Sequence, residues 1–126
     1  MYHISLDSEL SYLTPRIPRD RMSYEDDKTP RVCFSRSILG ACQAIGTNEL
    51  AIYTVYQPIH SNLLIEETTV DEVPDAEFTE ELWCLEEVEV KPIGTIQIYE
   101  TGNIIDWFNA YGDEMITKEK TYEWVK

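Results

Sequence analysis

Several apolar runs of this chain are short and rich in β-branched and aromatic side chains, which indicates strands. The clearest run, residues 50–56, reads Leu-Ala-Ile-Tyr-Thr-Val-Tyr and ends at Pro58. Such side chains favour strands because they pack well on a pleated surface. By the same reasoning, further strands are predicted at residues 2–6, 32–34, 82–88 and 95–99.

Two other stretches have helical spacing. Either Ser35 or Ser37 can cap a helix, because the apolar residues that follow, up to residue 45, form one face before Gly46. Residues 104–111 also place their apolar side chains at helical spacing. The sequence therefore predicts a helix after residue 37 and a second, short helix over 104–111.

The remaining segments indicate loops and turns. Residues 11–31 hold three prolines, so a loop over the fold is predicted there. Residues 66–81 are half acidic and indicate a solvated loop or a weak edge strand. Pro92 and Gly94 predict a turn that makes a hairpin of the flanking strands, while residues 121–125 are ambiguous between strand and coil.

Size and composition favour a single α+β domain spanning residues 1–126. The chain is 43% hydrophobic, and 126 residues can bury an adequate core without metal or disulfide staples. The net charge is −14, and residues 61–126 carry nearly all of it, with 17 acidic against 4 basic side chains. A surface this negative repels phosphates, so nucleic acid and membrane are poor partners, whereas basic protein surfaces and small molecules remain.

The cysteines and the termini indicate a cytoplasmic protein without a structural metal. Cys33, Cys42 and Cys84 have no CxxC spacing and lie among apolar neighbours, so each is expected to be a buried thiol. The first residues show neither a basic nor an apolar leader pattern, and no run is long enough to span a membrane.

Several enzyme classes are excluded by the absence of their motifs. The sequence contains no GxxxxGK[ST], GxGxxG, HExxH or GxSxG pattern. Its two histidines, His3 and His60, are too few for a histidine-rich metal site.

Three short motifs then follow one another in a particular order. They are Tyr-His-Ile-Ser at residues 2–5, Val-Cys-Phe-Ser at 32–35 before the predicted helix, and Glu-Leu-Trp at 81–83, which opens a strand after the acidic segment. In this order they resemble the motifs of the ADP-ribosyltransferase-like superfamily. The second motif lacks the tyrosine common in its His-Tyr-Glu group. The layout also looks like short uncharacterised proteins of Gram-positive bacteria and their phages.

The resemblance implies a split, mostly antiparallel β core with few helices, and NAD as substrate. It implies that His3 hydrogen-bonds the nicotinamide ribose and that Phe34 lies against the nicotinamide ring, with Ser35 of the same motif also binding the cofactor. It also implies that Glu81 binds the ribose 2′-hydroxyl and stabilises the developing cation. Arg31 belongs to an arginine group that could bind the pyrophosphate or, equally, form ion pairs with the acidic half of the chain. The acidic segment 66–80 would then face a basic acceptor.

Simpler readings of the same residues stay open. His3 could be a strand histidine satisfied by a backbone group, Phe34 a core residue and Glu81 a solvated acid. The chain could also be a non-enzymatic acidic protein that binds a basic protein surface, as a phage-type inhibitor or nucleic-acid mimic does, or an accessory phage protein. Geometry discriminates, because a nucleotide site requires His3 and Glu81 to face a common cleft.

Overall fold

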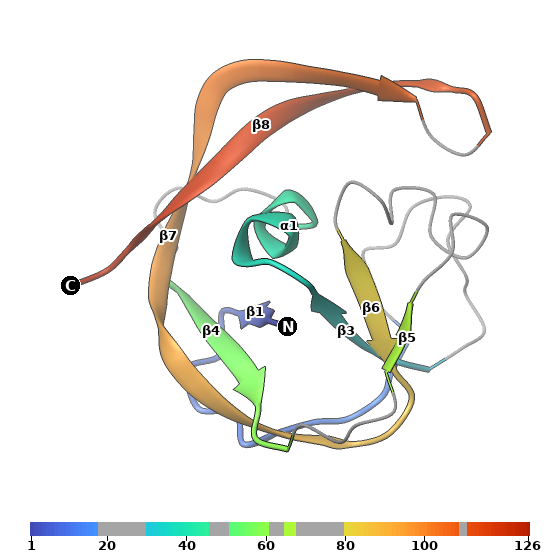
Figure 1. The fold of residues 1–126 in the computed structure, drawn as a ribbon. Helices are drawn as coiled ribbons and strands as arrows, with labels where there is room; N and C mark the ends of the chain where they lie inside the picture. Colours follow the sequence, from blue (N-terminus) through green and yellow to red (C-terminus); the bar gives the residue numbers. More distant parts are fainter. Residues whose placement is uncertain (18–29, 46–50, 61–64, 68–79, 109–110) are drawn as a thin grey trace.

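Antiparallel strands form nearly all of the structure, a computed structural model (Figure 1). It describes residues 1–17, 30–45, 51–60, 65–67, 80–108 and 111–126. The elements in chain order are β1 (His3–Ser5), β2 (Tyr12–Leu13), β3 (Val32–Ser35), α1 (Ile38–Gln43), β4 (Tyr53–Pro58), β5 (Ile65–Glu67), β6 (Glu81–Cys84), β7 (Val88–Phe108) and β8 (Glu114–Trp124).

The strands form two separate sheets. The first runs in the order β1-β4-β7-β2, with β8 also paired to β7, and the second in the order β3-β6-β5. Every strand pair is antiparallel. The described part of the chain is thus a mostly antiparallel β protein with one short helix, which confirms the expected mostly antiparallel β core with few helices.

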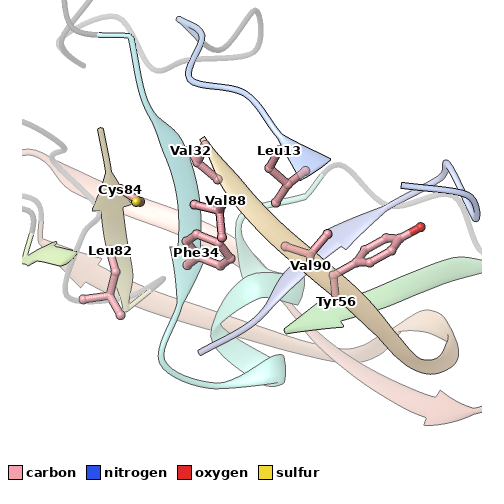
Figure 2. Close-up of a cluster of buried hydrophobic side chains, with 8 residues drawn as sticks. All are labelled: Leu13, Val32, Phe34, Tyr56, Leu82, Cys84, Val88 and Val90. Carbon is pink, nitrogen blue, oxygen red and sulfur yellow. The ribbon is translucent and has the colours of Figure 1, made fainter. Parts of the chain in front are cut away.

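Buried side chains from both sheets meet in one cluster (Figure 2). It contains Leu13, Val32, Phe34, Tyr56, Leu82, Cys84, Val88 and Val90. A second cluster packs α1 against the first sheet through Ile4, Ile38, Cys42, Tyr53, Val55, Ile96 and Ile98. The helix therefore lies in the space that the two sheets leave between them (Figure 1).

The predicted helix after residue 37 is confirmed. Ser37 is its N-cap: the side-chain oxygen accepts a hydrogen bond of 2.9 Å from the backbone N–H of Gly40. The Ser37 hydroxyl also donates to the carboxylate of Glu80. The predicted stop at Gly46 lies outside the described residues.

The predicted turn at Pro92–Gly94 is wrong, because β7 runs through it. Gly94 pairs with Val55 and Pro92 with Tyr56, so Ile93 is an extra residue on β7. A bulge of this kind interrupts the ladder locally, which is where a strand tolerates proline.

The predicted helix at 104–111 is also wrong. Residues up to Phe108 belong to β7 and pair with β8, and residues 109–110 lie outside the described part. The ambiguous segment 121–125 is strand up to Trp124.

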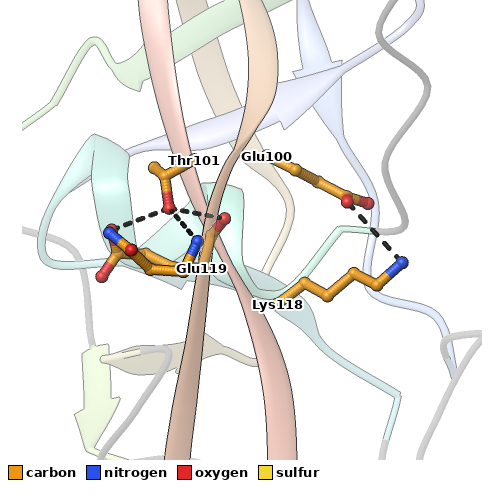
Figure 3. A network of polar contacts seen from close by, with 5 residues as sticks. Glu100, Thr101, Lys118 and Glu119 are labelled. Carbon is orange, nitrogen blue, oxygen red and sulfur yellow. Dashed lines mark hydrogen bonds and ion pairs between the residues drawn. The ribbon is translucent and has the colours of Figure 1, made fainter.

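A second bulge lies halfway along the β7–β8 hairpin (Figure 3). Glu100 pairs with Lys120 and Ile104 with Lys118, so residues 101–103 all face Glu119. The Thr101 hydroxyl donates to Glu119 Oε1 at 3.0 Å, and Gly102 has φ +89°, a conformation that glycine adopts without strain. Because bulges bend and twist a strand, the hairpin turns over α1 beyond this point (Figure 1).

The loop predictions hold in part. Within 11–31, residues 12–13 form β2 on β7, and Arg16 pairs with Arg31 through backbone hydrogen bonds of 3.0 Å. Residues 18–29 lie outside the described part. Of the acidic segment, β5 is an edge strand of the second sheet, and residues 68–79 lie outside the described part.

Candidate functional site

A small cavity lies where the two sheets approach each other beside α1. Its volume is about 130 Å³. The wall is formed by β1 and its preceding residue, β3, one side of the α1 segment and the first residue of β6: Tyr2, His3, Ile4, Cys33, Phe34, Ser35, Ala41, Ala44, Ile45 and Glu81. All three motifs singled out in the sequence therefore meet at this cavity.

Backbone and side-chain hydrogen bonds join the two sheets at the cavity. Tyr2 and Ser35 exchange backbone hydrogen bonds of 2.8 and 2.9 Å. His3 Nδ1 donates to the carbonyl oxygen of Cys33 at 2.9 Å. These contacts hold β1 against β3, so the first two motifs are neighbours although about 30 residues separate them in sequence.

The neutral form of the His3 ring has a defined tautomer. Because a carbonyl oxygen can only accept, Nδ1 carries the proton, and Nε2 of the neutral ring is an acceptor. Burial lowers the pKa of His3 from 6.5, an effect that the bond to Cys33 opposes and the Arg16 charge reinforces. His3 can therefore accept a hydrogen bond from a hydroxyl group.

Glu81 is held by a neighbour two residues along β6. Trp83 Nε1 donates to Glu81 Oε2 at 3.0 Å. Alternate residues of a strand share a face, which brings the two side chains together. The Trp83 ring in turn lies under Arg31, whose guanidinium carbon is 4.2 Å from the ring centroid. Arg31, Trp83 and Glu81 thus form a chain of contacts that ends at the cavity.

The other predicted site residues are placed less directly. Phe34 is 2% exposed and belongs to the core cluster; it contributes wall area and meets the His3 ring edge-on, with centroids 6.2 Å apart. Ser35 is buried and bonded through its backbone to Tyr2. Arg31 is buried and does not line the cavity. The structure thus brings His3, Phe34, Ser35 and Glu81 together, with Arg31 behind them.

Sequence reasoning missed several contributors to the cavity. Ala41 of α1 and the two residues that follow the helix, Ala44 and Ile45, line it, and the apolar spacing of residues 38–45 could have identified this side of the segment as a cavity wall. Trp83 could have been found from its position two residues after Glu81. Cys33 was expected to be buried but is only partly so, unlike Cys42 and Cys84.

A larger hollow of about 480 Å³ lies on the other side of α1, against the hairpin. Much of its polar lining is already engaged within the protein: Glu80 with Ser37, Glu119 with Thr101, and the Lys120 ammonium with the carbonyl of Ile45. The smaller cavity is therefore the better candidate site.

Among the described residues, no cluster of three or more His, Cys, Asp or Glu side chains could hold a metal ion. The same part of the chain contains no helix with the length and apolar character needed to cross a membrane. Comparisons with protein-family models, with curated proteins and with solved structures found no significant match.

Proposed function

We propose that this chain is an ADP-ribosyltransferase-like protein that binds NAD, with the nicotinamide end in the cavity between β1 and β3. One observation carries the proposal. His3 and Glu81 come from opposite sheets and from distant parts of the sequence, yet both line one small cavity. The split antiparallel core supports the same assignment.

Each residue has a chemical role that its surroundings suit. His3 Nε2 accepts a hydrogen bond from a ribose hydroxyl, since Nδ1 is committed to Cys33. Glu81 accepts from the ribose 2′-hydroxyl and stabilises positive charge on the anomeric carbon as nicotinamide leaves with the bonding electron pair. Trp83 orients the Glu81 carboxylate for this task. Phe34 and Ala41 provide an apolar wall for the ring.

The cavity volume restricts how NAD binds. At about 130 Å³ the cavity is smaller than the 300–1,000 Å³ typical of ligand pockets. It therefore holds one ring-sized group, and the rest of the dinucleotide lies outside it. Because affinity then depends on few buried contacts, we expect binding in the micromolar to millimolar range.

Calorimetric titration with NAD tests the proposal. Wild-type protein should bind, and His3→Ala should bind about tenfold more weakly after loss of one buried hydrogen bond. Glu81→Gln should reduce any transfer or NAD hydrolysis by about a hundredfold, a larger effect than on NAD affinity, because its charge acts in the transition state.

Matched controls are available for both variants. His60 is an exposed histidine that meets Glu89 at 3.3 Å, and Glu86 is an exposed acid outside the cavity. His60→Ala and Glu86→Gln should behave as wild type. Absence of NAD binding at millimolar ligand would refute the proposal.

A second candidate is non-enzymatic binding of a basic protein surface. The net charge of −14 favours it, because such a field steers basic partners and makes association fast and dependent on salt. A protein of this kind ignores NAD. Its binding to a basic protein should weaken steeply between low and high salt and should be insensitive to His3→Ala.

A further inference from the structure

The far half of the β7–β8 hairpin exposes large apolar side chains. Ile104, Phe108 and Ile116 are 68%, 70% and 70% exposed. Residues directly opposite each other, and every second residue of a strand, share a face of the hairpin. By the pairing of β7 with β8, one face, hereafter the hairpin face, consists of Ile104, Asp106, Phe108, Glu114, Ile116 and Lys118.

In the described part of the chain, no third strand pairs with the far half of the hairpin, whereas β4 pairs with its first half. The pairing of β4 with β7 reaches Ile96, and in the described part of the chain only β8 pairs with β7 beyond that residue. Figure 1 shows the two strands passing over α1 and extending away from β4. An isolated two-stranded hairpin is marginally stable in water, and exposed apolar patches rimmed by polar groups mark interaction sites.

The charges around the apolar residues indicate what binds there. Asp106 and Glu114 lie on the hairpin face, and the Lys118 ammonium lies 3.8 Å from Glu100 Oε2, which offsets its charge. A second copy of this chain would bring carboxylates against carboxylates, at a net charge of −14 per chain. A basic partner meets no such repulsion.

We propose that the hairpin face docks a partner protein that presents an apolar surface ringed by lysine and arginine side chains. The apolar residues supply affinity by burial, and the carboxylates supply orientation and a fast approach. This goes beyond NAD binding at the cavity. The hairpin face is the surface that binding of a basic protein, the second candidate function, would use. The expectation of a basic partner rests on that second candidate function.

A defined probe tests the proposal: a short synthetic peptide of alternating leucine and lysine, which forms an amphipathic basic strand. Two further peptides serve as comparisons, one of alternating serine and lysine and one of alternating leucine and glutamate. Binding is measured by fluorescence anisotropy at low and physiological salt. We expect the leucine–lysine peptide to bind at least about tenfold more tightly than either comparison.

A triple variant locates the binding. Ile104→Thr, Phe108→Thr and Ile116→Thr together keep β-forming side chains but remove the apolar surface. We expect this variant to lose about tenfold or more in affinity for the leucine–lysine peptide. The matched control replaces three exposed apolar residues elsewhere, Leu6, Ile59 and Leu85, with threonine and should stay within about twofold of wild type. Circular dichroism and urea denaturation verify that both variants are folded.

The outcomes separate the proposals. Equal binding of the serine–lysine peptide, or unchanged affinity in the hairpin variant, overturns docking at this face while leaving charge attraction elsewhere on the chain intact. A wild-type dimer in sedimentation that the hairpin variant abolishes shows that a second copy covers the face, which also overturns it. Loss of NAD binding in His3→Ala bears on the cavity alone.

Discussion

Replacing Trp83 by phenylalanine probes the contact that positions Glu81. The Trp83 side chain is 1% exposed, lies under the Arg31 guanidinium, and donates from Nε1 to Glu81 Oε2 at 3.0 Å. Phenylalanine keeps an aromatic ring in the same place. It removes the donor and part of the ring that Arg31 covers.

The expected loss of stability follows from these contacts. Phenylalanine is smaller by about three heavy atoms, and at about 0.8 kcal/mol for each buried methylene the lost burial amounts to about 2 kcal/mol. Loss of a hydrogen bond to a partly exposed carboxylate adds about 1 kcal/mol. We therefore expect Trp83→Phe to reduce the free energy of unfolding by about 3 kcal/mol.

Urea denaturation followed by circular dichroism measures this change. The matched control is Trp107→Phe, because Trp107 Nε1 also donates to a side chain, Thr117 Oγ1, at 3.0 Å, but on the exposed hairpin. Its expected loss is below about 1 kcal/mol. In a double-mutant cycle with Glu81→Leu, the coupling energy with Trp83→Phe should be about 1 kcal/mol. If Trp83→Phe were no more destabilising than Trp107→Phe, the reasoning would be refuted.

Three further predictions concern other positions. At about pH 8 a thiol reagent should modify Cys33 before the other cysteines, because Cys33 lines the cavity whereas burial raises the pKa of Cys42 to about 11. NAD should slow the modification of Cys33. Mass spectrometry of the peptides shows the order of modification, and a lack of protection by NAD would count against the proposed site. Gly94→Ala should lower stability by about 1–2 kcal/mol, because a Cβ there would lie 2.6 Å from the Trp124 ring and because φ at this position is +158°, which L side chains rarely adopt. In a Trp124→Ala background the loss measured by urea denaturation should become smaller without vanishing, and an unchanged loss would show that the clash does not contribute. Because burial lowers the pKa of His3 below 6.5, the unfolded chain binds a proton on this imidazole more readily than the folded chain does, so stability should fall as the pH drops below about 6.5. Urea denaturation between about pH 7 and pH 5 should show a shallower fall for His3→Asn than for wild type. Identical pH profiles would exclude His3 as the cause.

Part of the fold could be predicted because local chemistry decides it. The Ser37 cap and the apolar face after it define α1, and the β-branched run at 50–56 identifies the strand that becomes β4. The hairpin could not be predicted, since Ile104 and Phe108 lie on one face and Ile105 and Trp107 on the other. Apolar residues on both faces hide the alternation of a strand and imitate helical spacing.

The bulges in β7 defeated prediction for a different reason. Pro92 and Gly94 carry a genuine turn signal, but the extra residue Ile93 lets the strand absorb them. Whether such a signal ends a strand depends on a partner strand, here β4, that lies far away in the sequence.

The order of the motifs indicated residues that lie together in the structure, but not how each of them is placed. The sequence indicated that His3, Ser35 and Glu81 could share a site, and all three line one cavity. It could not show that the Phe34 ring is largely taken up by the core, or that Arg31 packs on Trp83 behind the cavity. Those outcomes depend on which face each strand buries once two sheets have packed together.

The joining of β1 to both sheets has a consequence for folding kinetics. The first strand pairs with β4, some fifty positions later in the chain, and Tyr2 pairs with Ser35 of the other sheet. Such long loops close slowly, so we expect β1 and the residue before it to find their partners late in folding. We therefore expect the cavity to be one of the last features to form during refolding, so that a signal from its lining residues measures completion of the native state rather than initial collapse.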